Sequence, residues 1–346
     1  MDGKQAHGPM RRSVVVITFV CAALAMLLAG ASAARASVAS GEANGAGSPF
    51  PVTIEHKFGR TVIPAEPKRI VAVGYHDHES LLAVGVVPVA LRYNYGDHPY
   101  GVFPWGQELL GGATPVVLDF PMGELDLEAI AALRPDLITA VYSGITRDEY
   151  ALLSRIAPTI AQSGEYIDFG MPWQEQTLVI GEAVGRKEQA EAAVAATEAR
   201  YEEIRRTHPQ FAGKKVILAV WREGGQIGLL AEQDVRMRVF TNMGFELPDG
   251  FDELFGDQFY AFISAEQLRM LEAADLVVWH QMAWSPGRWE IERHPLYASL
   301  RIAREGRHLF LETDVDDALQ FGTVLSLPYL LDRIVPALEE IFPAQQ

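Results

Sequence analysis

The chain has 346 residues, of which 29 are Lys or Arg and 45 are Asp or Glu, so its formal net charge is −16. A chain this acidic argues against nucleic acid as a partner. It also opposes anionic ligands over long range, so an anion would need arginines close to it. The length exceeds one ordinary hydrophobic core, and two domains are expected.

Residues 1–36 have the pattern of a signal peptide for export. Lys4, Arg11 and Arg12 precede an apolar stretch, and two A-x-A cleavage sites follow it. The pattern leaves Sec, twin-arginine and lipoprotein types open, as well as the cleavage site. We expect an exported protein, in the periplasm or on the outer face of the cell membrane.

Cys21 is the single cysteine of the chain and lies inside the apolar stretch. The residues before it are larger than those before an acylated cysteine, so a signal-peptide residue is expected rather than a lipid anchor. Beyond residue 36 the chain carries 25 basic and 44 acidic residues, a charge of −19. It then has no cysteine for a disulfide or a thiolate metal site.

Residues 37–51 are rich in Ala, Gly and Ser and are expected to form a flexible tether. An N-terminal α/β lobe is expected over residues 52–186. Short β-branched runs alternate there with helical patterns, which predicts a parallel sheet covered on both faces. The expected strands cover 69–73, 88–91, 116–118 and 137–141, and the expected helices include 79–84, 148–156 and 172–184.

The longest helical pattern covers residues 187–208 and is rich in Ala and Glu. Arg205 and Arg206 close it with a good C-terminal signal. A helix of this length spans about 30 Å, enough to connect two lobes. A C-terminal α/β lobe is expected over residues 209–346, and its acidic group Asp314, Asp316 and Asp317 is expected in a solvated turn.

A repeated segment links the two halves. Residues 125–142 read LDLEAIAALRPDLITAVY and residues 263–280 read ISAEQLRMLEAADLVVWH. Each copy places a Glu, Glu128 or Glu266, on the first turn of an amphipathic helix and ends in an apolar strand. A favourable interaction with the helix dipole would by itself explain each Glu. The duplication predicts two similar lobes with a ligand held between them.

Several segments together resemble the cluster-III periplasmic binding proteins of ABC importers, the iron–siderophore and cobalamin group. The carrying segments are PKRIVAVGYHDHESLLAVGVVPVAL (67–91), LDLEAIAALRPDLITAVYSG (125–144), YALLSRIAPTI (150–160), ISAEQLRMLEAADLVVW (263–279) and LSLPYLLDRIVPAL (325–338). Stretches such as GYHDHE and YGDHPYGVFPWG look most like actinobacterial iron–siderophore receptors.

The resemblance implies two Rossmann-like α/β lobes with mainly parallel sheets, joined by one long helix. It implies a ferric siderophore as transported ligand, with no cofactor, and an ABC permease dimer as membrane partner. It also implies that Glu128 and Glu266 dock onto arginines of the permease. We expect a monomer. Hydroxamate receptors place an Arg shortly before the first repeat helix, where this chain has residues 119–123, so the class of chelate stays open.

A second cluster, His76 to Glu79, follows a strand and opens a helix. Imidazole and carboxylate groups suit zinc or iron, although no second histidine cluster stands in the other half. Ligands of doubly wound lobes collect at the carboxyl ends of strands, which favours a ligand-binding role for Tyr75 or His76. Asp77 and Glu79 could equally cap the helix.

Large aromatic and Arg side chains gather at the ends of the expected strands, as a wide site for a bulky organic chelate would require. Guanidinium groups can donate to the oxygens around ferric iron. The expected ligand-binding residues are Tyr75, His76, Arg92, Tyr95, Trp105, Tyr142, Trp221, Arg222, Trp279, Trp284 and Arg288.

The sequence contains no pattern typical of a catalytic site, and no catalytic residue or resident metal is expected. A binding protein rather than an enzyme is therefore predicted. Two alternatives stay open: a haem or cobalamin carrier, and a metal-dependent enzyme that uses the cluster from His76 to Glu79.

Overall fold

The computed structural model describes residues 49–256, 258–280 and 285–344, which belong to one compact unit of residues 47–346. The expected signal peptide, most of the tether and Trp284 lie outside the described residues. Among the described helices, none is both long enough and apolar enough to cross a membrane.

The N-lobe is a five-stranded parallel sheet with an antiparallel hairpin beside it. The hairpin is β1 (Val52–His56) and β2 (Gly59–Ile63). The sheet order is β5 (Val116–Leu118), β4 (Ala90–Arg92), β3 (Ile70–Ala72), β6 (Leu137–Ala140) and β7 (Thr159–Ala161). The helices are α1 (Asp77–Ala83), α2 (Leu127–Ala132), α3 (Arg147–Leu153) and α4 (Trp173–Ala183), with short 3₁₀ turns η1 (Pro99–Gly101) and η2 (Pro104–Leu110).

The C-lobe has a mixed five-stranded sheet in the order β10 (Tyr260–Ser264), β9 (Gln226–Leu230), β8 (Val216–Trp221), β11 (Leu276–Trp279) and β12 (His308–Phe310). Strands β8, β11 and β12 are parallel, whereas β9 and β10 are antiparallel additions at one edge. Its α-helices are α6 (Val235–Asn242), α7 (Asp252–Phe255), α8 (Arg288–Arg293), α9 (Pro295–Ala298), α10 (Arg301–Arg304), α11 (Thr313–Phe321) and α12 (Ser326–Ile341). Its 3₁₀ segments are η3 (Pro209–Phe211), η4 (Glu223–Gly225) and η5 (Ala265–Ala273).

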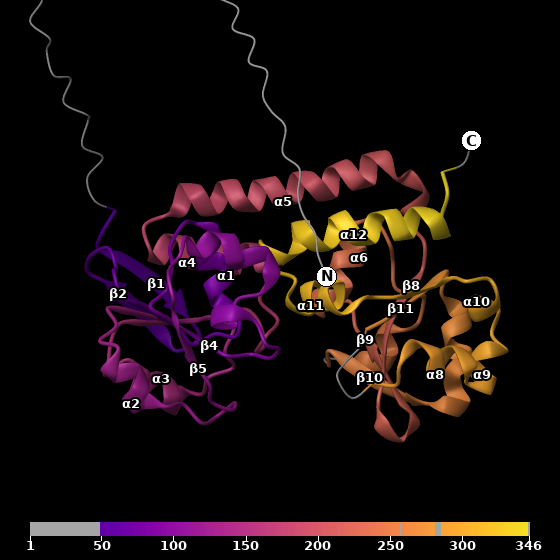
Figure 1. Ribbon diagram of the computed structural model, residues 1–346, viewed down its shortest axis with the longest axis horizontal. Helices are drawn as coiled ribbons and strands as arrows, with labels where there is room; N and C mark the ends of the chain where they lie inside the picture. Colours follow the sequence, from indigo (N-terminus) through magenta and orange to yellow (C-terminus); the bar gives the residue numbers. More distant parts are fainter. Residues whose placement is uncertain (1–48, 257, 281–284, 345–346) are drawn as a thin grey trace, which may run out of the picture. The chain divides into compact units, whose positions relative to one another are not determined.

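One long helix, α5 (Lys187–Thr207), follows the N-lobe and precedes the C-lobe. It runs along both lobes, with α12 beneath its second half (Figure 1). Arg205 and Arg206 lie in its last turn, where their charges complement the helix dipole. The expected fold class, two α/β lobes joined by one long helix, is confirmed.

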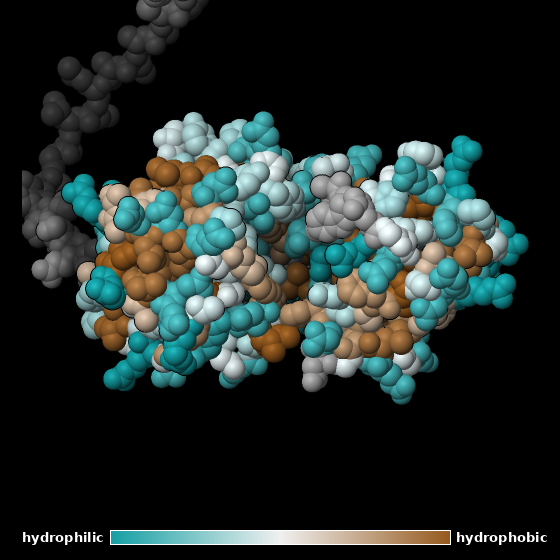
Figure 2. All heavy atoms as spheres, turned by 90° about the horizontal axis from the view of Figure 1, so that it is seen from below, coloured by the Kyte–Doolittle hydropathy of each residue, from teal (hydrophilic) through white to brown (hydrophobic). Residues whose placement is uncertain are grey.

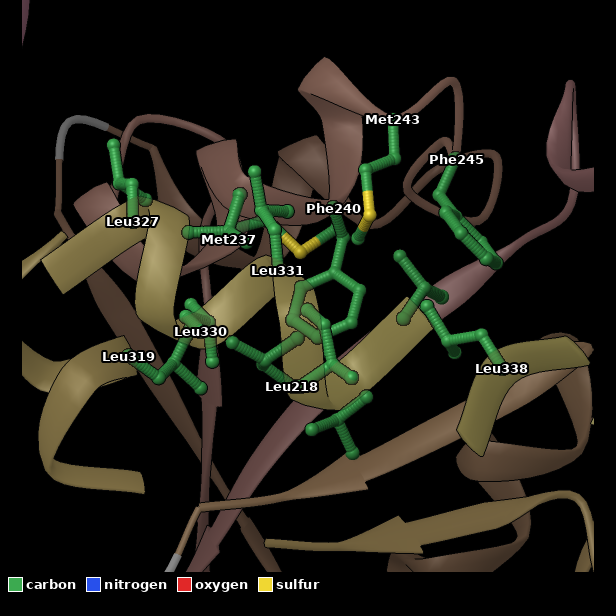
Figure 3. Packing of buried hydrophobic residues seen from close by; sticks show 14 of the residues in the cluster. Leu218, Met237, Phe240, Met243, Phe245, Leu319, Leu327, Leu330, Leu331 and Leu338 are labelled. Atoms are coloured by element: carbon green, nitrogen blue, oxygen red, sulfur yellow. The ribbon is translucent and has the colours of Figure 1, made fainter. Parts of the chain in front are cut away.

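The C-lobe core shows why its α-helices pack where they do. Met237 and Phe240 of α6, Leu330 and Leu331 of α12, and Leu218 of β8 are all buried in one cluster (Figure 3). Pro336 stands inside α12, yet this helix keeps a continuous apolar face because Leu327, Leu330, Leu331, Ile334 and Leu338 follow the helical period.

Two local expectations are wrong. Residues 313–321 form the helix α11 rather than a solvated turn, and Asp316 is 3% exposed within it. The second repeat helix is a 3₁₀ segment, η5, whereas the first repeat contains the α-helix α2.

Candidate functional site

Gly74 and Asp77 join the ends of two neighbouring strands of the N-lobe. The buried Asp77 carboxylate accepts hydrogen bonds from the backbone N–H of Val141 at 2.8 Å and of Tyr142 at 2.9 Å. A Cβ on Gly74 would stand 2.1 Å from Asp77 Oδ1, so only glycine leaves room for this carboxylate. Burial raises the pKa of Asp77, and the two N–H donors oppose this rise.

This junction places Tyr75 and Tyr142 side by side at the carboxyl ends of β3 and β6. The Tyr75 N–H donates to the Tyr142 carbonyl at 3.0 Å. The Asp77 carboxylate bonds to the strand end of β6 rather than capping α1, although Asp77 and Glu79 both stand in the first turn of this helix, where a negative charge is favourable. The carboxylate positions the two tyrosines.

Arg92 lies behind Tyr75 rather than at the surface. Its guanidinium carbon is 3.9 Å from the Tyr75 ring centroid and 4.8 Å from that of Phe120, and the residue is 2% exposed. Burial lowers its pKa. Arg92 would therefore act on a ligand at Tyr75 electrostatically, through the aromatic ring, and not as a direct hydrogen-bond donor.

His76 packs against Tyr142 with the two rings tilted by 35° and their centroids 3.9 Å apart, and it is 3% exposed. Its Nε2 atom has no hydrogen-bond partner among the described residues. Burial, with the charge of His78 as a lesser cause, lowers the pKa of His76 to about 3. The imidazole is therefore neutral at physiological pH.

On the C-lobe side, Arg236 and Asp234 form a paired group next to the N-lobe tyrosines. Arg236 Nε and Nη2 donate to the two Asp234 oxygens at 2.8 and 2.7 Å. Burial acts to raise the pKa of Asp234, but Arg236 and, to a lesser extent, His280 outweigh it, so this pKa is lowered. Burial also raises the pKa of Tyr142, and Asp234, Arg236 and Arg238 all act on that hydroxyl.

One further hydrogen bond connects the lobes at this place, since Arg238 Nη1 donates to the Gly170 carbonyl at 3.2 Å. Within the C-lobe, His280 Nδ1 lies 2.6 Å from Asp316 Oδ1, and both side chains are almost fully buried. Polar groups of both lobes therefore meet at the strand ends, where ligands of doubly wound folds collect.

Phe321, the last residue of α11, is inserted among aromatic rings of the N-lobe. It stacks on Tyr95 at 5.7 Å and contacts Phe103 edge-on at 4.7 Å. Trp105 and His76 lie at 6.3 and 5.7 Å. Tyr95 and Trp105, expected to contact ligand, are thus committed at least in part to packing between the lobes.

Glu79 contributes a second buried connection, since its carboxylate accepts a hydrogen bond from the Thr323 hydroxyl of the C-lobe. Burial raises its pKa to about 7. Neither ring nitrogen of buried His78 has a hydrogen-bond partner in the described part of the chain. Within the same residues, no group of three or more His, Cys, Asp or Glu side chains could hold a metal ion.

Three other expected ligand residues, Trp221, Trp279 and Arg288, make their contacts within the C-lobe. Trp279 is fully buried, and its indole N–H donates to the Tyr297 hydroxyl at 3.0 Å inside the C-lobe core. Trp221 is 6% exposed and packs on Trp279. Arg288 pairs with Glu292 on α8 at 2.8 Å. The expectation that Trp279 faces a ligand is corrected, because its indole is satisfied within the core.

The surface is hollowed where the two lobes meet, as seen from the side away from α5 (Figure 2). The sequence profile of the family described as periplasmic binding protein matches residues 70–314.

The chain belongs to the periplasmic binding protein family.

Two solved structures and a sequence relative agree with this membership. A periplasmic solute-binding protein of Mycobacterium smegmatis is 34% identical, with a TM-score of 0.75, over 84% of this chain and 98% of that chain. PiaA of Streptococcus pneumoniae, solved in complex with ferrichrome, is 26% identical, with a TM-score of 0.71, over 84% of this chain and 98% of its own. A probable siderophore-binding lipoprotein, YfiY of Bacillus subtilis, is 25% identical, and the match covers 82% of this chain and 86% of that protein.

In this family member the two repeated glutamates lie on the surface of separate lobes. Glu128 is exposed on the first turn of α2, and Glu266 is exposed at the start of η5. A hydrogen bond from Ser264 lowers the pKa of Glu266. Both side chains are free of salt bridges within the described residues and are accessible to a partner.

The sequence did not single out several residues that the structure brings to the junction. Phe321 and Phe169 belong here, because Phe169 contacts Tyr142 edge-on at 5.0 Å. The sequence also did not single out Tyr260 and Phe262 of the edge strand β10. The structure shows both rings exposed, by 51% and 42%. Their alternate spacing, with aromatic residues at the first and third positions of the run YAFIS, is the signal that could have identified them.

Proposed function

We propose that the chain binds a ferric siderophore where its two lobes meet and delivers it to the permease of an ABC importer. The observation that carries the proposal is that Arg236 of the C-lobe helix α6 approaches Tyr142, which lies beside Tyr75 at the strand ends of the N-lobe. Aromatic faces and a fixed guanidinium suit a bulky chelate whose metal is surrounded by oxygen atoms.

The relatives support this ligand class. PiaA was solved with ferrichrome, and YfiY is named for siderophore binding. The role is binding rather than catalysis, in keeping with relatives that are named as binding proteins. Glu128 and Glu266, one on each lobe, are the groups that would dock on the permease.

Quenching of tryptophan fluorescence tests the proposal directly. Ferric hydroxamate, catecholate and mixed chelates are titrated into the exported chain, with the iron-free ligands, haem and cobalamin alongside. We expect saturable quenching by at least one ferric chelate at submicromolar concentration. Quenching only by haem or cobalamin would replace the siderophore with that ligand, and quenching by none of the ligands would reject the proposal.

A pair of variants locates the ligand. Tyr142→Ala removes a ring at the lobe junction. It should lower the affinity for the ferric chelate about tenfold, which corresponds to about 1.4 kcal/mol of binding free energy. Leu152→Ala, on the exposed side of α3 in the same lobe, should leave affinity unchanged. Equal affinities for both variants would place the ligand elsewhere.

A further inference from the structure

A small cavity lies on one face of the antiparallel edge of the C-lobe sheet. Its volume is about 230 Å³. Strands β8, β9 and β10 supply most of its wall, and α6 supplies one arginine. The lining residues are Val220, Arg222, Gly228, Leu230, Arg236, Tyr260 and Phe262.

The floor of this cavity is flat and apolar because Gly228 leaves it bare. Val220 and Leu230 flank the glycine on the same face. Gly228 is not required by its backbone conformation, since its φ is not positive. A Cβ built there would meet the Phe262 ring at 3.5 Å, an ordinary contact. The glycine therefore keeps open a space that a side chain could fill without distortion.

Aromatic and cationic groups form the rim. Tyr260 and Phe262 lie 5.1 Å apart on the edge strand and are both exposed, which is costly for rings without an apolar partner. The Arg222 guanidinium lies 5.1 Å from the Phe262 ring centroid. Arg236 is held in one orientation by Asp234 and by Gln320, to which Nη1 donates at 3.1 Å.

The cavity is next to the lobe junction. Arg236 lines the cavity and also acts electrostatically on Tyr142 of the N-lobe. A larger cavity of about 470 Å³ has a different lining, in which Glu232 and Asp252 stand beside Arg238.

We infer that this cavity is a subsite for a planar aryl arm of the chelate, a hydroxyphenyl or dihydroxyphenyl group. The ring would lie on the Gly228 floor beside Phe262 and Tyr260, with its oxygen atoms toward Arg222 and Arg236. A flat apolar floor with guanidinium groups at the rim matches a flat ring with polar atoms at its edge. The inference rests on the proposed function and narrows its ligand class.

Two synthetic ferric chelates of equal charge provide the test. One carries three hydroxamate arms, and the other carries two hydroxamates and one hydroxyphenyl-oxazoline arm, so both ferric complexes are neutral. Affinities are measured by fluorescence quenching for the wild type, Gly228→Val and Phe262→Ala. Val62→Ala, on the exposed side of the distant β2 strand, serves as the control.

We expect the aryl-armed chelate to bind at least about tenfold more tightly than the three-hydroxamate chelate. Gly228→Val and Phe262→Ala should remove most of this preference and leave the affinity for the other chelate within about twofold. Equal binding of both chelates, or equal losses for both in the variants, would overturn the subsite while leaving siderophore binding intact. Failure of both chelates to bind the wild type, together with failure of the wider panel, would instead reject the proposed function.

Discussion

Glu79 of the N-lobe and Thr323 of the C-lobe form a buried hydrogen bond between the two lobes. Thr323 is also bonded to Ser326, the first residue of α12, because the Ser326 N–H donates to the Thr323 hydroxyl oxygen at 3.0 Å and the Thr323 N–H donates to Ser326 Oγ at 2.9 Å. The Glu79 carboxylate of the N-lobe is thus connected, through Thr323, to the first residue of α12 in the C-lobe. Tyr95, in the same lobe as Glu79, is a titratable side chain whose pKa the charge of Glu79 helps to raise.

The Glu79→Gln variant should remove a pH dependence of stability. Burial raises the pKa of Glu79 from 4.5 to about 7. Between these values the folded state holds a proton that the unfolded state has lost, so stability falls as pH rises from about 4.5 to about 7. Gln keeps an acceptor for Thr323 without the charge. The free energy of unfolding of Glu79→Gln relative to wild type should therefore increase through this pH range, by on the order of 3 kcal/mol at pH 8.

Urea unfolding at pH 5, 6, 7 and 8 measures this difference for the two proteins side by side. The other titrating groups are common to both and cancel in the difference. Parallel pH profiles for wild type and Glu79→Gln would show that Glu79 remains hydrated, and would remove it as a pH-dependent connection between the lobes.

His78 should act in the opposite direction. It is 2% exposed, and burial lowers its pKa from 6.5 to about 4. The unfolded state therefore binds a proton first as pH falls, and stability is lost between about pH 6.5 and 4. His78→Leu removes this loss and two unpaired ring nitrogens. The free energy of unfolding of the variant minus that of wild type should be larger at pH 5 than at pH 7.5. The same difference at both pH values would contradict this account.

Phe321 should be the main apolar anchor between the lobes. Phe321→Ala empties a socket formed by Tyr95, Phe103 and Trp105, and such changes cost about 3–5 kcal/mol. Phe321→Leu is the matched variant, since it keeps most of the volume and should cost less than about 1.5 kcal/mol. Thermal unfolding gives the stabilities. Equal, small losses for both variants would show that the socket does not hold the lobes.

The repeated segment shows how much of the fold the sequence could predict. Asp136 accepts from the backbone N–H groups of Lys68 and Arg69, at 2.8 and 2.7 Å, at the start of β3. Asp275 accepts from the N–H of Lys215 at 3.0 Å, at the start of β8. The Asp-Leu pair that recurs in both halves thus fixes the central strands of both sheets. Because strand and helix periods are local, the two-lobed architecture could be predicted.

The site was harder to predict, because side-chain direction at a strand end depends on tertiary packing. Trp279 is the last residue of β11, and Tyr142 stands two residues after the equivalent strand β6. The Trp279 indole donates to Tyr297 in the core, while Tyr142 is half-buried beside His76. Phe321 stands 179 residues after Tyr142 in the sequence, and no local pattern announces their proximity. The three acidic residues of α11 suggested a solvated turn for the same reason. Asp316 is buried by its contact with His280, which is distant in the sequence and leaves no local signal.

The two exposed glutamates allow docking to be separated from binding. Glu128 and Glu266 lie on different lobes and outside the aromatic junction, and a permease dimer would engage them through paired guanidinium contacts. We expect the double variant Glu128→Ala, Glu266→Ala to abolish uptake of radioactive iron in cells that carry the cognate permease, while its affinity for the ferric chelate stays within about twofold. Each single variant should reduce uptake partially, since one charged contact remains. Glu191→Ala, an equally exposed glutamate on α5, controls for the loss of surface charge and should transport normally. A large loss of chelate affinity in the double variant, or undiminished uptake, would contradict the docking assignment.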